Sequence, residues 1–156
     1  MASQLDRDQK SGLFIVSYNI FKPGVAGGYN LQLRLSVYPP ARRVSGEAVI
    51  THATQQPLVF KTSVQGNFEE ISGGIELFLA GHNLLQAQAQ HGQQQAHSLL
   101  GEDFHFDGHL KGGWQAENGS RARYAFLQHG HWTEVIGQDI QLSDEVRHAA
   151  KALNLR

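Results

Sequence analysis

The stretch NLQLRLSVY, Asn30 to Tyr38, decides the fold class of this chain. Leu31, Leu33, Leu35 and Val37 occupy every second position, and Gln32, Arg34, Ser36 and Tyr38 fill the positions between them. Successive side chains of a β-strand point to opposite faces, so this alternation predicts a strand with one buried and one solvent-facing side. The chain is therefore expected to build a sheet that covers an apolar core.

Further apolar and β-branched runs recur along the chain between turn residues. They span residues 12–21, 44–53, 58–71, 75–82, 104–117 and 121–142. Prolines 39–40, Ser72–Gly74, Asn118-Gly119 and Gly130 mark the turns, and Asn118-Gly119 is typical of a type I′ hairpin. Short strands joined by turns predict an all-β fold, either an antiparallel β-sandwich or an up-and-down β-barrel of about eight to ten strands.

One domain is expected from a chain of 156 residues. Residues 1–11 read as a flexible N-terminal tail, 12–142 as a single β domain with a polar, Gln-rich loop at roughly 84–100, and 143–156 as a short C-terminal helix capped by Ser143. Gly46 inside a strand indicates a bulge or a close approach of two backbones. The predicted core consists of Leu31, Leu33, Leu35, Val37, Ile50, Phe60, Leu77, Phe104, Phe106 and Phe126.

Composition excludes several classes of function. Thirteen basic and fourteen acidic residues give a net charge of -1, which does not provide the basic surface that nucleic acid requires. The absence of cysteine excludes disulfides and thiol chemistry. A polar N-terminus and the lack of an apolar run of about 18 residues predict no signal peptide and no membrane helix. We expect a cytoplasmic protein, with secretion by a route that uses no classical signal peptide left open.

Nine histidines are a high count for this length, and several cluster near the segment FHFDGHLKGG, residues 104–113. On a strand, alternate side chains share a face, so the candidate metal ligands are His105, Asp107, His109, His129 and His131. Zinc takes three or four such ligands when they converge from neighbouring strands. Gly108 and Gly130 indicate turns that would break this alternation, and the other interpretation is an ordinary solvent-facing strand. The sequence favours that second interpretation, so no cofactor is predicted and zinc is the alternative.

Three aromatic residues in the C-terminal hairpins are candidates for ligand binding: Trp114, Tyr124 and Trp132. If they are exposed, their rings could stack on a sugar or another flat ligand. If they are buried, they belong to the core.

Three segments of the N-terminal half carry a family resemblance. They contain Gly12, Leu13, Phe14 and Val16; then Val44, Ser45, Gly46, Ile50, Thr51, Ala53, Pro57 and Leu58; then Gly66 and Phe68. In these positions the chain resembles the family catalogued as domain of unknown function 1842, over residues 11–80. The resemblance implies a bacterial single-domain β protein. It implies no activity, cofactor or catalytic residue.

The sequence favours a non-enzymatic module that binds a small molecule, a carbohydrate or a protein, or that assembles as a homo-oligomer. One alternative is a metal-dependent enzyme that uses the His-rich strand face. Another alternative is a secreted effector or toxin-like β protein. No nucleophile-elbow motif is present to anchor a hydrolase triad.

Overall fold

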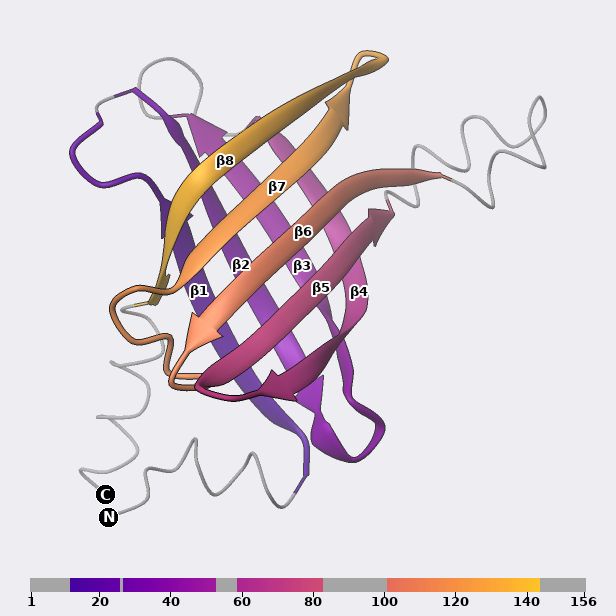
Figure 1. Ribbon diagram of the computed structural model, residues 1–156. Helices are drawn as coiled ribbons and strands as arrows, with labels where there is room; N and C mark the ends of the chain where they lie inside the picture. Colours follow the sequence, from indigo (N-terminus) through magenta and orange to yellow (C-terminus); the bar gives the residue numbers. More distant parts are fainter. Residues whose placement is uncertain (1–11, 26, 53–58, 83–100, 144–156) are drawn as a thin grey trace, which may run out of the picture.

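The computed structural model describes residues 12–25, 27–52, 59–82 and 101–143. These residues form eight antiparallel strands that close into one barrel, with each strand bonded to its neighbours in sequence and β1 bonded to β8 (Figure 1). The strands are β1 (Phe14–Phe21), β2 (Tyr29–Tyr38), β3 (Arg43–His52), β4 (Phe60–Ile71), β5 (Gly74–His82), β6 (Glu102–Lys111), β7 (Arg121–Gln128) and β8 (His131–Leu142), with the 3-10 helix η1 (Pro39–Ala41) between β2 and β3.

The all-β, antiparallel class predicted from the sequence is confirmed, in the form of an up-and-down barrel. The predicted tail of residues 1–11 and the predicted Gln-rich loop at 84–100 lie outside the described residues. The same is true of the predicted C-terminal helix beyond Ser143. No helix in the described part of the chain is both long and apolar enough to cross a membrane.

Side chains from all eight strands fill the interior of the barrel. All ten predicted core residues are buried, which confirms the alternation that starts at Leu31. An eight-stranded barrel has an interior just wide enough for its own side chains. Here Phe60, Phe104 and Phe126 pack against one another, with ring centres 6.4 Å and 5.5 Å apart for the two contacts of Phe60. The barrel is therefore held together by a continuous apolar core.

Two glycines let neighbouring strands approach closely. A Cβ on Gly46 would lie 1.9 Å from the carbonyl oxygen of Arg34, and one on Gly66 would lie 1.8 Å from that of Phe78. Both glycines stay in register with their partner strands. Of the two roles predicted for Gly46, the structure therefore shows the close approach.

The connection between β6 and β7 differs from its prediction. We expected a strand as far as residue 117, but β6 ends at Lys111 because Gly112 and Gly113 take φ of 77° and 119°. Gly119 has a φ of 104°, while Asn118 does not have a positive φ, so this turn is not type I′. The positive φ pair expected there occurs instead at His129 and Gly130, between β7 and β8.

The β6–β7 loop, residues 112–120, closes one end of the barrel with Trp114. The indole contacts the rings of Phe14 and Phe68 edge-on, at centre distances of 5.6 Å and 5.0 Å. The hydroxyl of Tyr18 donates a hydrogen bond to the carbonyl oxygen of Trp114. These contacts fix the loop at this end of the barrel. They do not involve the outward side chains of β5 to β8.

Candidate functional site

The outward side chains of β5, β6, β7 and β8 form the surface that we call the β5–β8 face. Strand register aligns them in three rows. The first row is Ala80, His105, Ala125 and Glu134; the second is Phe78, Asp107 and Arg123; the third is Glu76, His109, Arg121 and Asp139. Because each row crosses paired strands, the rigid sheet fixes the spacing of these groups.

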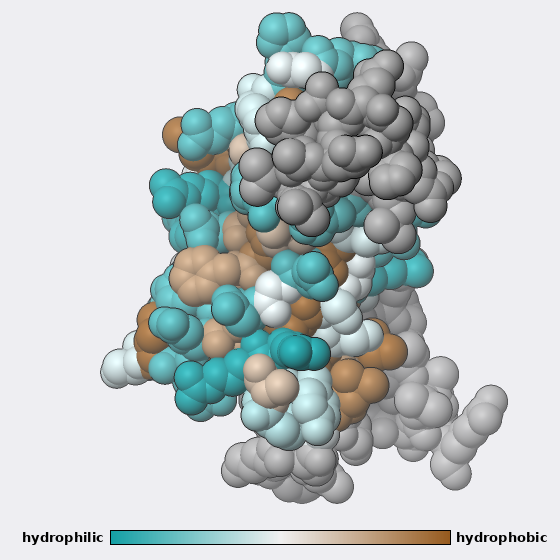
Figure 2. All heavy atoms as spheres, turned by 90° about the vertical axis from the view of Figure 1, so that its right-hand side faces the viewer, coloured by the Kyte–Doolittle hydropathy of each residue, from teal (hydrophilic) through white to brown (hydrophobic). Residues whose placement is uncertain are grey.

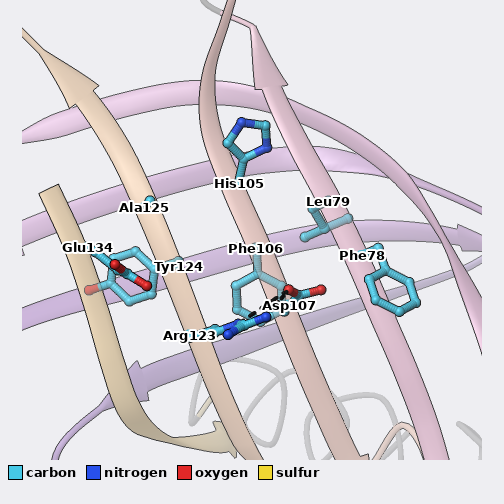
Figure 3. Close-up of a pocket in the computed structure, with 9 residues that line it drawn as sticks. All are labelled: Phe78, Leu79, His105, Phe106, Asp107, Arg123, Tyr124, Ala125 and Glu134. Carbon is cyan, nitrogen blue, oxygen red and sulfur yellow. Dashed lines mark hydrogen bonds and ion pairs between the residues drawn. The ribbon is translucent and has the colours of Figure 1, made fainter. Parts of the chain in front are cut away.

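A hollow of about 350 Å³ lies over Ala125 on this face (Figure 3). Its rim is built from longer outward side chains, namely Phe78, His105, Asp107, Arg123 and Glu134. Ala125 contributes only a methyl group between His105 on β6 and Glu134 on β8, which are its register partners. The difference in side-chain length explains why the surface is recessed at this point.

Ion pairs connect the strands along the face. Arg123 on β7 lies 3.4 Å from Asp107 on β6, measured from Nη2 to Oδ2, and Figure 3 shows this pair beside the hollow. In the next row, Nδ1 of His109 is 2.8 Å from Oε1 of Glu76. All four side chains are at least one-third exposed, so each pair stabilises the fold by less than about 1 kcal/mol. Their position on the surface leaves them available to a ligand.

The indole of Trp132 extends over the β5–β8 face from β8 towards β6, beside the hollow. Trp132 starts on β8, opposite Leu127 on β7, yet its indole stacks on the imidazole of His105 on β6. The ring centres are 5.1 Å apart and the ring planes differ by 24°. Trp132 is 47% exposed, so it remains accessible to a flat ligand.

A bulge in β8 extends the surface beyond the hollow. The register between β7 and β8 shifts between Ala122 and Tyr124, opposite Gly137 with its φ of 67°. As a result Ile136 and Gly137, which are consecutive, are both exposed. Such bulges redirect side chains near functional sites. Here the bulge adds Ile136 to a second depression, which also contains Phe78, Asp107 and Arg123.

The structure places the predicted metal ligands in separate positions. His105, Asp107 and His109 all point outward from β6, as predicted, but each faces a different partner: Glu102 and Trp132, Arg123, and Glu76 respectively. His129 lies in the β7–β8 turn and His131 begins β8. In the described ranges, no three His, Asp or Glu side chains come together in an arrangement that could hold a metal ion.

Gly108 does not form the turn that we expected beside these histidines. It lies within β6 and faces the interior, where a Cβ would come 2.6 Å from Cε1 of Phe106. The absence of a side chain gives the Phe106 ring its space. The turn expected at Gly130 is confirmed.

Two of the three predicted stacking residues belong to the core. Trp114 and Tyr124 are each 2% exposed, whereas Trp132 lies on the surface. Burial, and secondarily the neighbouring Tyr29, raise the pKa of the Tyr124 hydroxyl above its usual range. Tyr124 therefore stays neutral, and although it borders the hollow over Ala125 it exposes almost none of its surface.

Sequence reasoning missed Phe78 and Ala125 as residues of the face. Phe78 occupies the same parity as Glu76 in the segment IELFLAGH, and an aromatic ring among solvent-facing positions was an available signal. Ala125 carried no such signal, because its importance depends on longer neighbours from two other strands.

A second polar feature lies in the barrel wall. The β5–β6 register shifts between Gly81 and His82, so that Asp103 as well as Phe104 is buried. Oδ1 of Asp103 accepts a hydrogen bond of 2.7 Å from the Thr62 hydroxyl. This hydrogen bond connects β4 with β6 within the wall.

The model of one protein family matches residues 11–132, from just before β1 to the first residues of β8. Its description is domain of unknown function, DUF1842. The chain belongs to the DUF1842 family. The match covers more than three-quarters of the sequence and confirms the resemblance seen at Gly12 and at Val44 to Leu58. No curated protein matches the chain. For this DUF1842 protein, function must therefore be inferred from the surface itself.

Proposed function

We propose that this DUF1842 chain is a non-enzymatic binding module and that the β5–β8 face is its recognition surface. The observation that supports this most strongly is the hollow over Ala125 with exposed apolar groups on either side of it. The barrel interior is filled by core side chains, so a ligand would bind outside the barrel.

Three exposed apolar side chains lie on this surface. Phe78, Trp132 and Ile136 are 40%, 47% and 64% exposed, and they lie on β5 and β8, the two outer strands of the face. Seen from the side of β4 and β5, apolar groups interrupt an otherwise largely hydrophilic surface (Figure 2). Apolar groups that sit among polar ones in this way are typical of recognition surfaces.

The polar groups of the face suit binding better than catalysis. Asp107 and Arg123 neutralise each other, and His109 is held by Glu76. The same donors and acceptors can hydrogen-bond a ligand without any change in protonation.

A retention experiment tests this proposal. The protein is immobilised and exposed to an extract of the cells that produce it, and retained components are identified by mass spectrometry. We expect at least one component whose retention falls tenfold or more in the double variant Phe78→Ala/Ile136→Ala. The matched control is Tyr38→Ala/Ile71→Ala, which removes an aromatic ring and an isoleucine that are similarly exposed outside this face. If no component depends on Phe78 and Ile136, the proposal is wrong.

A further inference from the structure

We infer that the ligand of the β5–β8 face is a neutral oligosaccharide, with one sugar ring in the hollow over Ala125. This inference rests on the proposed function and adds the chemical class of the ligand. Shape, hydrogen-bonding groups and net charge support it separately.

The shape of the surface favours an elongated ligand that lies along the barrel. The hollow over Ala125 and the depression beside Ile136 share Phe78, Asp107 and Arg123, so they lie side by side along the face. Small apolar ligands usually bind in enclosed pockets that remove most of their surface from water. We call the hollow over Ala125 and the depression beside Ile136 together the trough. Its open shape suits a chain of polar rings that keeps one side in solvent. Small β-barrels of other families bind oligosaccharides across a face of strands in this way.

The polar groups of the trough match the hydroxyl groups of a sugar. Each hydroxyl both donates and accepts a hydrogen bond, so neighbouring hydroxyls require a donor next to an acceptor. Arg123 supplies fixed N–H donors and Asp107 supplies acceptors, 3.4 Å apart on adjacent strands. On the other side of Ala125, Glu134 adds a second carboxylate. Both sides of a ring in the hollow would therefore meet hydrogen-bonding groups.

The aromatic groups match the apolar side of a sugar ring. A pyranose presents C–H groups on one face, and an aromatic ring can cover them without needing a hydrogen bond. Phe78 borders the hollow on β5, and Trp132 lies beside it with its ring already fixed against His105. Because the stack with His105 orders the indole beforehand, binding costs less side-chain entropy.

The charge of the face argues against a strongly charged ligand. Its three rows contain four carboxylates, Glu76, Asp107, Glu134 and Asp139, and two guanidinium groups, Arg121 and Arg123, so the formal net charge is two minus four, or -2 with histidines neutral. A polyanion would be repelled by the carboxylates, and a polycation would meet the two arginines next to them. A neutral ligand with many hydroxyls avoids both costs.

Calorimetric titration with three neutral hexasaccharides, cellohexaose, maltohexaose and chitohexaose, tests the inference. We expect at least one to bind the wild-type protein, with at least a tenfold loss of affinity in Asp107→Asn and in Trp132→Ala. The matched controls are Glu47→Gln on β3 and Tyr38→Ala on β2, which change a half-exposed, ion-paired carboxylate and an exposed ring elsewhere and should bind normally. A heparin hexasaccharide and hexalysine, each in the same buffer, are expected to show no binding through this face.

The results separate the ligand class from the proposed function. If none of the three sugars binds while a retained extract component still depends on Phe78 and Ile136, the inference is wrong and the recognition surface stands. The same holds if that component is a protein or a charged polymer. If a sugar binds to Asp107→Asn and to Trp132→Ala as tightly as to the wild-type protein, the inference is also wrong. If neither the sugars nor any extract component depends on the face, both proposals fall.

Discussion

The indole of Trp132 on β8 stacks on the imidazole of His105 on β6, with ring centres 5.1 Å apart, although β7 lies between these two strands. The residue of β7 that pairs with His105 is Ala125, and its small methyl group leaves room for the indole to lie over β7. The same small side chain forms the floor of the hollow. One alanine therefore accounts for both the position of the indole and the recess beside it.

Filling the hollow should abolish recognition without unfolding the barrel. We expect Ala125→Leu to lower affinity for the retained component at least tenfold, because the larger side chain occupies the recess. Ala125 is partly exposed, so the free energy of unfolding should change by less than about 0.5 kcal/mol. Ala41→Leu, at an exposed alanine of η1, is the control. Binding and chemical denaturation measure both effects, and normal affinity in Ala125→Leu would contradict the assignment of the hollow.

The two tryptophans should differ sharply in their contribution to stability. Trp114 is 2% exposed and packs on Phe14 and Phe68, so Trp114→Ala should lower the free energy of unfolding by about 3–5 kcal/mol. Trp132→Ala removes an exposed ring, and we expect a loss below about 1 kcal/mol. Urea denaturation of the two variants compares these values directly. Equal losses would show that the end of the barrel is not closed by Trp114.

Close strand approach predicts a specific sensitivity at Gly66. A Cβ there would lie 1.8 Å from the carbonyl oxygen of Phe78, so Gly66→Ala forces β4 and β5 apart. We expect it to lower the free energy of unfolding by about 1–3 kcal/mol. Gly28→Ala is the matched control, because its nearest contact would be an ordinary 3.9 Å from Val25. Melting temperatures of both variants test the prediction. A stable Gly66→Ala protein would mean that the two strands are less closely paired.

Alkaline pH should destabilise the fold through two buried tyrosines. Burial raises the pKa of both Tyr18 and Tyr124 above the usual value of 10.0, so the unfolded chain loses these protons first as pH rises. The contribution of these tyrosines to the free energy of unfolding is fully present below pH 10. Above pH 10 it declines by about 1.4 kcal/mol per pH unit for each tyrosine. Denaturation between pH 8 and pH 11.5 measures this decline.

Phenylalanine substitutions separate the two tyrosines. Within the described part of the chain, the Tyr124 hydroxyl has no hydrogen-bond partner, whereas that of Tyr18 is bonded to Trp114. Tyr124→Phe should therefore leave stability at neutral pH unchanged or slightly higher and reduce the alkaline decline. Tyr18→Phe should lower the free energy of unfolding by about 1 kcal/mol at neutral pH. An unaltered alkaline decline in Tyr124→Phe would contradict the assignment.

The barrel was predictable to the extent that it depends on local alternation. Leu31 to Val37 and the other core positions follow a period of two, which the sequence carries within each strand. The hairpin at Asn118-Gly119 was not predictable in this way, because Gly112 and Gly113 end β6 earlier and Trp114 fills the end of the barrel. That outcome depends on contacts with residues far away in the chain.

The candidate site was only partly predictable for the same reason. Outward positions of His105, Asp107 and Trp132 follow from alternation, but their partners depend on the register between separate strands, which the pattern within one strand does not give. Glu76 and His109 are 33 residues apart, and their ion pair cannot be read from either segment alone. The hollow over Ala125 likewise appears only after β6, β7 and β8 are aligned.

Mapping of backbone amide shifts by NMR during titration with a retained component tests the central claim most directly. The account predicts that the largest changes occur at Asp107, Arg123, Ala125 and Glu134, on the three adjacent strands of the hollow. Largest changes on β1 to β4, or in the loop that carries Trp114, would contradict the claim that the β5–β8 face is the recognition surface.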